Sequence, residues 1–234
     1  ISGDKFIADL LLKQGAKVDS LSLRDESPLI LAARHGNTAV GELLLSRGAN
    51  VHHTDQAGWT ALHWSAASTQ AQPEMNQLLL RYRANVHARG VAQDASGIIP
   101  LKRTPRDWTP LHLAARSGRP KTIHQLLEAG ADPNALTGDH QTPLSIAIRP
   151  DGLEAVLLLL NRGAQPNFPG QTRTPLHIAA EKQVFDVAQA LVSHGANVEA
   201  KNRKGHRPVD IILARMDESD RGPWLSVLTP ASEK

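Results

Sequence analysis

A seven-residue motif recurs along this chain at a nearly constant interval. Its fullest copy is Thr-Pro-Leu-His-Leu-Ala-Ala at residues 109–115. Weaker copies begin at Ser27, Thr60, Thr142, Thr174 and Arg207. The second residues of successive copies are 33, 49, 33, 32 and 33 positions apart. A repeated unit of this size is one supersecondary element that cannot bury its apolar face alone, so the units are expected to stack.

Each motif predicts a short helix, followed by a second one. A Thr or Ser hydroxyl can cap free backbone N–H groups, and proline tolerates the first helical position because it lacks the N–H that would stay unpaired there. Gly36 and Gly118 end two of these first helices. Leucine-rich runs predict the second helices, at 43–45, 78–80, 126–127, 157–160 and 191–192. Four of these runs are followed by Gly-Ala, whereas the run at 78–80 is followed by Arg83-Ala84 and lacks the glycine. An extended pair and a polar turn then lead to the next motif.

The Thr-Pro-Leu-His-x-Ala motif with its period near 33 resembles the ankyrin repeat family, from about Lys5 to Met216. The resemblance implies an all-α ankyrin-repeat solenoid, helix-turn-helix units with β-hairpin loops, in about six repeats including partial terminal ones. We expect a single domain over residues 1–234. Its expected parts are a partial first repeat 1–21, full repeats at about 22–54, 55–103, 104–136, 137–168 and 169–201, and a capping repeat 202–228.

The second full repeat departs from the period. The chain takes 25 residues from Ala84 to Thr109 but 11 from Ala49 to Thr60, which predicts a 14-residue insertion near 89–106. It is either a tolerated hairpin loop or a finger that touches a partner. At the start, residues 2–14 resemble a second helix without its first, either cut from a longer array or serving as a cap, and we favour the cut. At the end, Trp224, Leu225 and Leu228 are expected to fold back as a short lid.

Composition excludes several functions. The chain has no cysteine, so disulfides and thiolate metal sites are excluded. Its longest apolar run, Val156–Leu160, is too short to span a membrane. No phosphate loop, H-E-x-x-H, G-x-S-x-G or Ca²⁺-loop motif occurs, so we expect no enzyme activity, cofactor or metal. A formal charge of +3 over 234 residues without aromatic–basic interleaving argues against nucleic-acid binding. Nothing points to secretion, and we expect an intracellular protein, cytoplasmic or nuclear, monomeric by itself.

The eleven histidines suggest metal or catalytic chemistry, but their spacing favours structure. His63, His112 and His177 occupy the motif, where the family uses the ring to hydrogen-bond the backbone of a neighbouring hairpin. His52, His53 and His87 lie near hairpin turns and lack an evident third ligand.

Partners of this family usually bind the concave surface formed by hairpin tips and first helices. The variable positions around the motif are therefore the candidate contacts. As partner-binding residues we predict Arg24, Arg34, Trp59, Arg106, Trp108, Arg116, Arg149, Arg173 and Lys182. The same rule marks Arg203, Lys204 and His206 in the last repeat. Trp59 and Trp108 hold equivalent positions, and Trp and Arg dominate interface hot spots; packing over their own hairpins is the alternative.

The leading functional hypothesis is a non-enzymatic protein–protein interaction module that binds a protein partner, an acidic or extended segment or a folded one, through the concave face. The alternative is a regulatory ankyrin segment of a larger enzyme, channel or signalling protein.

Overall fold

The structure is a computed structural model that describes residues 2–68, 73–90, 107–169 and 173–229. The expected Arg89–Arg106 insertion lies almost wholly outside the described residues. The described residues form two compact units: residues 1–132 with 137–139, and residues 133–136 with 140–234. We call them unit 1 and unit 2 and describe each by itself. That the chain is one domain stays a prediction.

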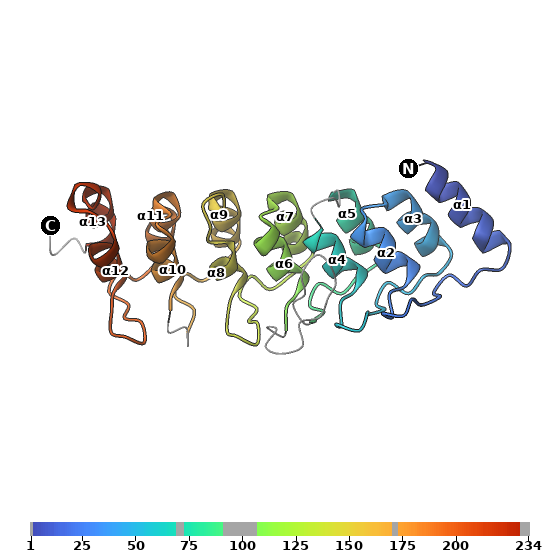
Figure 1. Cartoon of the computed structure of the whole chain (residues 1–234), viewed down its shortest axis with the longest axis horizontal. Helices are drawn as coiled ribbons and strands as arrows, with labels where there is room; N and C mark the ends of the chain where they lie inside the picture. The colour runs from blue at the N-terminus through green and yellow to red at the C-terminus, as the bar shows by residue number, and fades with distance from the viewer. Residues whose placement is uncertain (1, 69–72, 91–106, 170–172, 230–234) are drawn as a thin grey trace. The chain divides into compact units, whose positions relative to one another are not determined.

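Both units are built from helices (Figure 1). Unit 1 contains α1 (Ser2–Lys13), α2 (Pro28–Arg34), α3 (Thr38–Ser46), α4 (Ala61–Ala67), α5 (Pro73–Arg81), α6 (Pro110–Ser117) and α7 (Pro120–Glu128). Unit 2 contains α8 (Pro143–Ala147), α9 (Leu153–Asn161), α10 (Pro175–Lys182), α11 (Phe185–Ser193), α12 (Pro208–Arg215), a 3₁₀ turn (Glu218–Asp220) and α13 (Gly222–Leu228). Within the described ranges the only β pairing is an isolated bridge between Gly90 and Trp108. The all-α prediction is confirmed.

The six motifs form the first helices α2, α4, α6, α8, α10 and α12, and each begins as expected. The hydroxyl of Ser27 accepts a hydrogen bond from the N–H of Ile30 at 3.3 Å, and Thr142 accepts one from Ser145 at 3.2 Å. Proline occupies the first turn of every first helix except α4. These caps satisfy backbone donors that a helix start leaves unpaired.

The fourth motif residue completes the cap from the other side. Nδ1 of His63 accepts from the N–H of Thr60 at 3.2 Å, and Nδ1 of His112 accepts from Thr109 at 3.1 Å. Where the motif departs from His, the replacement does the same: Oγ of Ser145 accepts from the N–H of Thr142 at 3.0 Å. In the last copy, Oδ2 of Asp210 accepts from Arg207 at 2.7 Å. This reciprocal pairing is a capping box that tolerates three chemistries.

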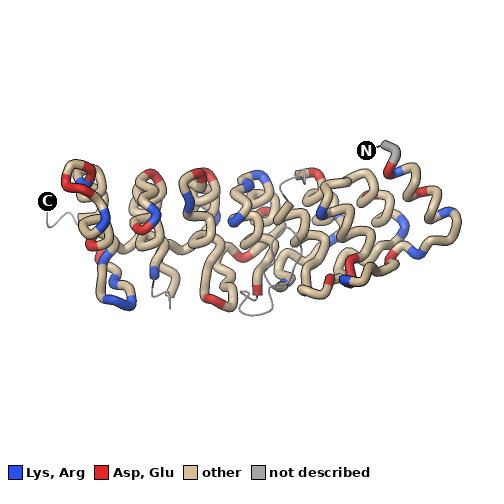
Figure 2. Tube along the Cα trace, in the orientation of Figure 1, with Lys and Arg blue, Asp and Glu red and all other residues tan. Residues whose placement is uncertain are grey.

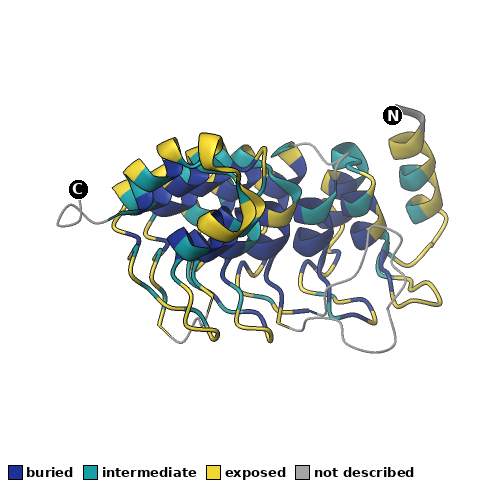
Figure 3. Ribbon diagram, turned by 60° about the vertical axis from the view of Figure 1, so that its left-hand side comes forward, coloured by how far each residue is buried: buried dark blue, intermediate teal, exposed yellow. Residues whose placement is uncertain are grey.

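The cores of the two units are aliphatic. The motif leucines Leu62, Leu111, Leu144 and Leu176 have no exposed surface, and neither have most of the alanines one turn later. Full burial of a leucine stabilises the fold by about 2 kcal/mol. The small alanines let α2 and α4, α4 and α6, and α10 and α12 pack closely. Figure 3 shows the buried residues on the faces that the helices turn toward one another.

The two ends of the chain differ in burial. The apolar side chains of α1 remain exposed, 71% for Phe6 and 56% for Ile7. Polar contacts hold α1 against α3, including an ion pair of 2.6 Å between Asp9 and Arg47. At the other end α13 covers α11 and α12, with Trp224 packed edge-on to Phe185 at 5.4 Å between ring centroids. The expected fold-back is confirmed, and the folded-back segment is a helix that begins at Gly222.

Candidate functional site

We define the inner face of each unit as the surface of its first helices together with the adjoining hairpin turns. In Figure 1 these helices lie between the hairpins and the layer of second helices. All nine predicted contact residues belong to these segments of sequence. The structure shows which of them are available to a partner.

Trp59 is not available. Its side chain is only 1% exposed and packs edge-on against Trp64, with ring centroids 4.8 Å apart. Asp55 fixes this corner, because its carboxylate accepts hydrogen bonds from the N–H of Trp59 at 2.9 Å and from Nε1 of Trp64 at 2.8 Å. The expectation that Trp59 is an exposed anchor is therefore wrong. The indole packs against α4 and lies beside Gly90, which belongs to the next hairpin.

Trp108 is also buried, at 5% exposed. Its backbone forms both hydrogen bonds of the bridge to Gly90, at 2.9 and 3.0 Å. The Arg116 guanidinium carbon lies 5.6 Å from the centroid of the indole, a distance that allows a cation–π interaction. The exposure assumed for Trp108 is therefore also wrong: its ring packs beside α6, with the His112 ring centroid 5.9 Å away.

Several predicted cations already hold intramolecular partners. Arg34 pairs with Glu26 at 2.9 Å, and its guanidinium carbon lies 4.6 Å from the Trp64 centroid. Arg149 pairs with Asp151 at 2.8 Å, and Arg173 pairs with Glu181. Partly exposed pairs of this kind contribute little to stability, about 0–1 kcal/mol, and can be exchanged for a partner's carboxylate.

Side chains at or just after the ends of the first helices carry out a structural task that the sequence did not reveal. They donate to backbone carbonyls at the end of the preceding first helix in the same unit. In unit 1 the donors are Ser68 to Arg34 (2.9 Å), Ser117 to Ala67 (3.2 Å) and Arg119 to Ser68. In unit 2 they are Lys182 to Ile148 (2.6 Å) and Arg215 to Glu181 (2.9 Å). Because helix ends leave such carbonyls unpaired, Lys182 acts first as a cap.

The remaining predicted residues differ in whether the structure describes them. Arg24 and Arg116 are exposed on unit 1, whereas Arg106 lies outside the described residues. A role in partner binding stays a prediction for all of the predicted cations.

Unit 2 contains a hollow of about 550 Å³ on its inner face. It is lined by Arg173, Glu181, Asn202, Arg203, Lys204, His206, Asp210, Ile211, Ala214 and Arg215. Arg173 alone among them belongs to the nine predicted residues. Arg215 occupies the same motif position as Lys182, so the rule that selected Lys182 would also have found it in the degraded last motif.

The two carboxylates of this hollow, Glu181 and Asp210, form ion pairs with arginines of the same unit. Glu181 pairs with Arg173, and Asp210 accepts the backbone N–H of Arg207, which lowers the pKa of Asp210 below its usual value. The Arg207 guanidinium acts in the same direction, 3.4 Å from Asp210. Asp210 therefore stays ionised near neutral pH, and both acids hold an arginine partner inside the unit.

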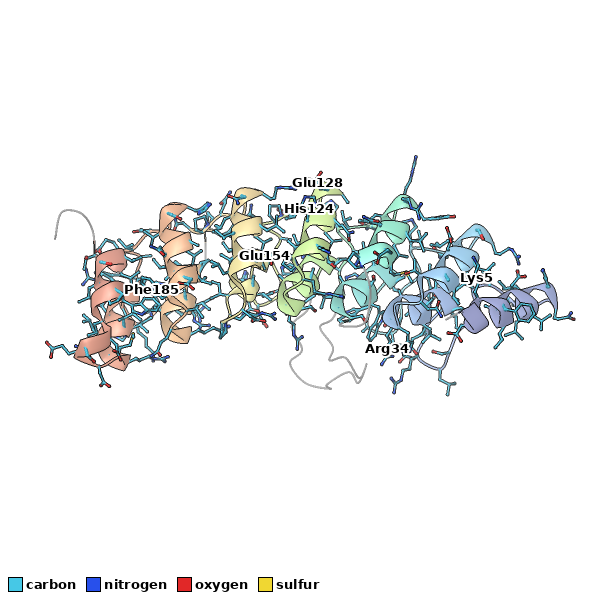
Figure 4. All side chains as sticks on the ribbon, turned by 90° about the horizontal axis from the view of Figure 1, so that it is seen from above. Lys5, Arg34, His124, Glu128, Glu154 and Phe185 are labelled. Atoms are coloured by element: carbon cyan, nitrogen blue, oxygen red, sulfur yellow. The ribbon has the colours of Figure 1, made fainter. Side chains whose placement is uncertain are left out.

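Unit 1 has a second hollow, of about 830 Å³, on its other side, between α3, α5 and α7. Figure 4, which looks onto the second helices, shows His124 and Glu128 projecting from α7 beside it. Its walls mix carboxylates with Arg81 and glutamine side chains.

Two further properties concern only the described residues. None of their His, Asp and Glu side chains form a group of three that could hold a metal ion. No described helix has both the length and the apolar character needed to cross a bilayer.

Helix pairs joined by hairpins, stacked through small residues and capped by a reciprocal Thr–His pair, define an α-helical repeat protein. A family model for ankyrin repeats in three copies matches residues 1–90 and again residues 111–202. The chain therefore belongs to the ankyrin repeat family. Domains of this family generally serve protein–protein interaction and are typically not enzymes.

Similar proteins agree with this. Ankyrin repeat protein nuc-2 of Neurospora crassa is 40% identical over 126 residues, covering 54% of this chain and 10% of that protein. Human ankyrin repeat and SOCS box protein 3 is 38% identical over 112 residues, covering 48% of this chain and 19% of that protein. The chain thus spans under a fifth of the length of either relative.

Solved structures show the same fold. The ankyrin repeat domain of human ASB11 has a TM-score of 0.80 at 24% identity, covering 98% of this chain and 96% of that one. The ankyrin repeat domain of Bcl-3 has a TM-score of 0.67 at 26% identity, covering 88% and 86%.

Proposed function

We propose that this chain is a non-enzymatic module that binds a protein partner through the inner face. The observation that carries the proposal is the hollow between the last hairpin turn and α12, which presents polar and charged side chains to solvent instead of completing the core. On the inner face of unit 1, Arg24 and Arg116 are exposed to solvent. Exposed Arg on a rigid scaffold is typical of recognition surfaces.

Site-specific photo-crosslinking tests this proposal. A photoreactive residue is placed in turn at Arg24, Arg116 and Lys204 on the inner face. Matched positions on the second helices are His124 and Glu154, which are exposed and visible in Figure 4. We expect the same protein to be attached from the inner positions and then to bind the purified chain. Attachment only from the second helices would contradict the proposal.

A second candidate is that the chain serves as the recognition segment of a longer protein. It is favoured by the small share of each relative that the chain covers. One such relative, E3 ubiquitin-protein ligase XB3 of Oryza sativa, is 32% identical over 136 residues, which is 29% of its length. An antibody against this segment would then detect an endogenous protein much larger than 25.3 kDa. A band at that mass would contradict this candidate.

A further inference from the structure

We propose that the hollow in unit 2 binds a carboxylate-rich, extended segment of a partner protein, with Arg203 and Lys204 as its principal contacts. This inference rests on the proposed function and specifies the chemistry of the partner. Figure 2 shows basic positions at the tip of the last hairpin, below α12. The two side chains line one wall of the hollow, and Arg215 lines it from α12.

The state of these cations separates them from the other basic residues nearby. Arg173 and Arg207 are already paired, with Glu181 and with Asp210 and Glu199. Within the part of the chain that the structure describes, the side chains of Arg203 and Lys204 form no ion pair or hydrogen bond. They are exposed and therefore have unused donors: five N–H groups on Arg and three on Lys.

The turn that carries them is fixed before any partner arrives. Oδ1 of Asn202 accepts hydrogen bonds from the N–H groups of Lys204 at 2.9 Å and His206 at 3.1 Å. The backbone closes the same turn, Asn202 N–H to His206 O at 2.9 Å and Gly205 N–H to Asn202 O at 2.8 Å. His177 of α10 then ties it to the helix layer through the His206 carbonyl, at 2.9 Å. Preorganised donors lose less conformational entropy on binding.

The charge of the hollow favours an anionic ligand. Four lining residues are Lys or Arg and two are acids. The acids are satisfied by Arg173 and Arg207, so a ligand meets mainly the fields of Arg203, Lys204 and Arg215. A carboxylate can pair bidentately with Arg, the stronger geometry for an ion pair. Complementary charge raises the rate of encounter and selects against basic segments.

The apolar part of the hollow indicates a protein segment instead of a nucleic acid. Ile211 and Ala214 line its helical wall, and among the residues that the structure describes no Trp, Tyr or Phe lines it. Single-stranded nucleic acids are bound largely by stacking bases on aromatic rings, which this surface lacks. An acidic segment that also carries aliphatic side chains matches both halves of the lining. A volume of about 550 Å³ is within the range of binding clefts.

The test uses fluorescence anisotropy on the full chain with a labelled peptide of repeated Glu-Glu-Leu triplets. The double variant Arg203→Glu and Lys204→Glu is expected to bind the peptide about tenfold or more weakly, the loss of two charge-assisted contacts. The matched control is Lys201→Glu, which reverses a charge on the same hairpin outside the hollow. It should weaken binding much less, by about twofold, since an exposed charge outside the hollow makes no direct contact with the peptide and is partly screened by salt.

Two further arms make the outcome decisive. A Lys-Lys-Leu peptide should bind the double variant better than the parent chain, and circular dichroism should show both folded. Equal loss in the double variant and in Lys201→Glu would overturn the inference in favour of general charge attraction. An oligothymidylate is also tested as a second anion. If it bound the parent chain as tightly as the Glu-Glu-Leu peptide does, and lost as much affinity in the double variant, the inference would be overturned in favour of a general polyanion site. Failure of the peptide test can be told apart from failure of the proposed function. If the peptide test fails but photo-crosslinking from Arg24 and Arg116 captures a partner, only the chemistry assigned to unit 2 is wrong, and the proposed function stands.

Discussion

Nε2 of His63 lies 3.1 Å from the carbonyl oxygen of Trp108, although 45 positions separate the two residues in the sequence. The carbonyl can only accept, so Nε2 carries the proton, and Nδ1 is left to accept from Thr60. One neutral tautomer therefore caps its own helix and holds the next hairpin. The role that the family resemblance implied for this ring is confirmed, as it is for His177, whose Nε2 lies 2.9 Å from the His206 carbonyl.

This arrangement predicts a pH dependence of stability. Burial lowers the pKa of His63 to about 4, against the opposing hydrogen bonds to the Trp108 and Ala88 carbonyls. The unfolded chain takes up the proton near pH 6.5, so acid favours unfolding between these values. We expect the free energy of unfolding to fall by about 3 kcal/mol between pH 6.5 and 4 on account of His63.

Urea denaturation at several pH values measures this fall. The variant His63→Gln should be less stable at neutral pH but show a shallower loss on acidification. His177, whose pKa burial also lowers, contributes to the same window and remains in both proteins. Identical slopes for parent and variant would show that His63 is not the group involved.

Trp59→Ala is predicted to destabilise unit 1 by about 3–5 kcal/mol, because it empties a fully buried site. Urea unfolding followed by circular dichroism gives the value. Tyr82→Ala removes an aromatic ring that is 41% exposed and should cost less than about 1 kcal/mol. If the two variants proved equally stable, the indole would have to lie on the surface, as the sequence alone had suggested.

The contrast between the motif and these tryptophans shows what sequence can predict. Helix starts, caps and small-residue faces depend on neighbours within one turn, so period and motif identify them. The burial of Trp59 depends on Gly90, 31 positions later, whose Cα leaves no room for a Cβ: one placed there would lie 2.5 Å from the Trp59 ring. No local pattern contains that contact.

The same limit, that a local pattern does not contain contacts between distant residues, explains which parts of the candidate site the sequence predicted. Arg24 and Arg116 are exposed, as variable positions beside the motif are expected to be. Lys182, in contrast, donates a hydrogen bond to the Ile148 carbonyl at the end of the preceding first helix. This contact exists only because the repeats stack. The hollow in unit 2 likewise forms from separate segments, which are Arg173, Glu181 of α10, the turn at 202–206 and α12, and these come together only in the folded chain.

Arg83→Gly is predicted to stabilise the chain. Arg83 adopts φ +61°, whereas the equivalent residues at 48, 130, 163 and 195 are glycines with φ between +83° and +91°. A left-handed conformation costs a residue with a Cβ about 1–2 kcal/mol, partly offset by the greater entropy of unfolded glycine. We expect a net gain of about 0.5–1 kcal/mol by thermal denaturation. The control Gln77→Gly, at an exposed position inside α5, should destabilise by about 1 kcal/mol.

Asn134→Ala is predicted to destabilise unit 2 by about 1–2 kcal/mol, the loss of two hydrogen bonds. Nδ2 of Asn134 donates to the Gly163 carbonyl at 2.9 Å, and Oδ1 accepts from the Gln165 N–H at 2.8 Å. Asn167 repeats the pattern one repeat later, with Gly195 and Asn197. Asn167→Ala should therefore have a similar effect, measured by urea unfolding. Asn161 is exposed and has one polar contact, between its Oδ1 and Nε2 of His194 at 3.2 Å, so Asn161→Ala should have a smaller effect.

The last prediction concerns the length of the second hairpin. Asp55 donates its backbone N–H to the Trp59 carbonyl at 3.0 Å across three intervening residues. Gly90 donates to Trp108 at the same distance, but 17 residues intervene, so the extra 14 fall in the sequence between two residues whose backbones pair. Asp107, with φ +64°, occupies the place that Gly58 holds at +76°.

Replacing residues 91–106 by Gln-Ala, the pair at 56–57, would thus restore the regular turn. The cost of closing a loop grows slowly with its length, so we expect a small gain in stability, about 1–2 kcal/mol. Calorimetry measures it, with the bridge between Gly90 and Trp108 checked by hydrogen exchange. A large loss of stability would mean instead that Ile98, Ile99 or Leu101 packs against the helices, because removing buried aliphatic side chains costs about 2–5 kcal/mol each.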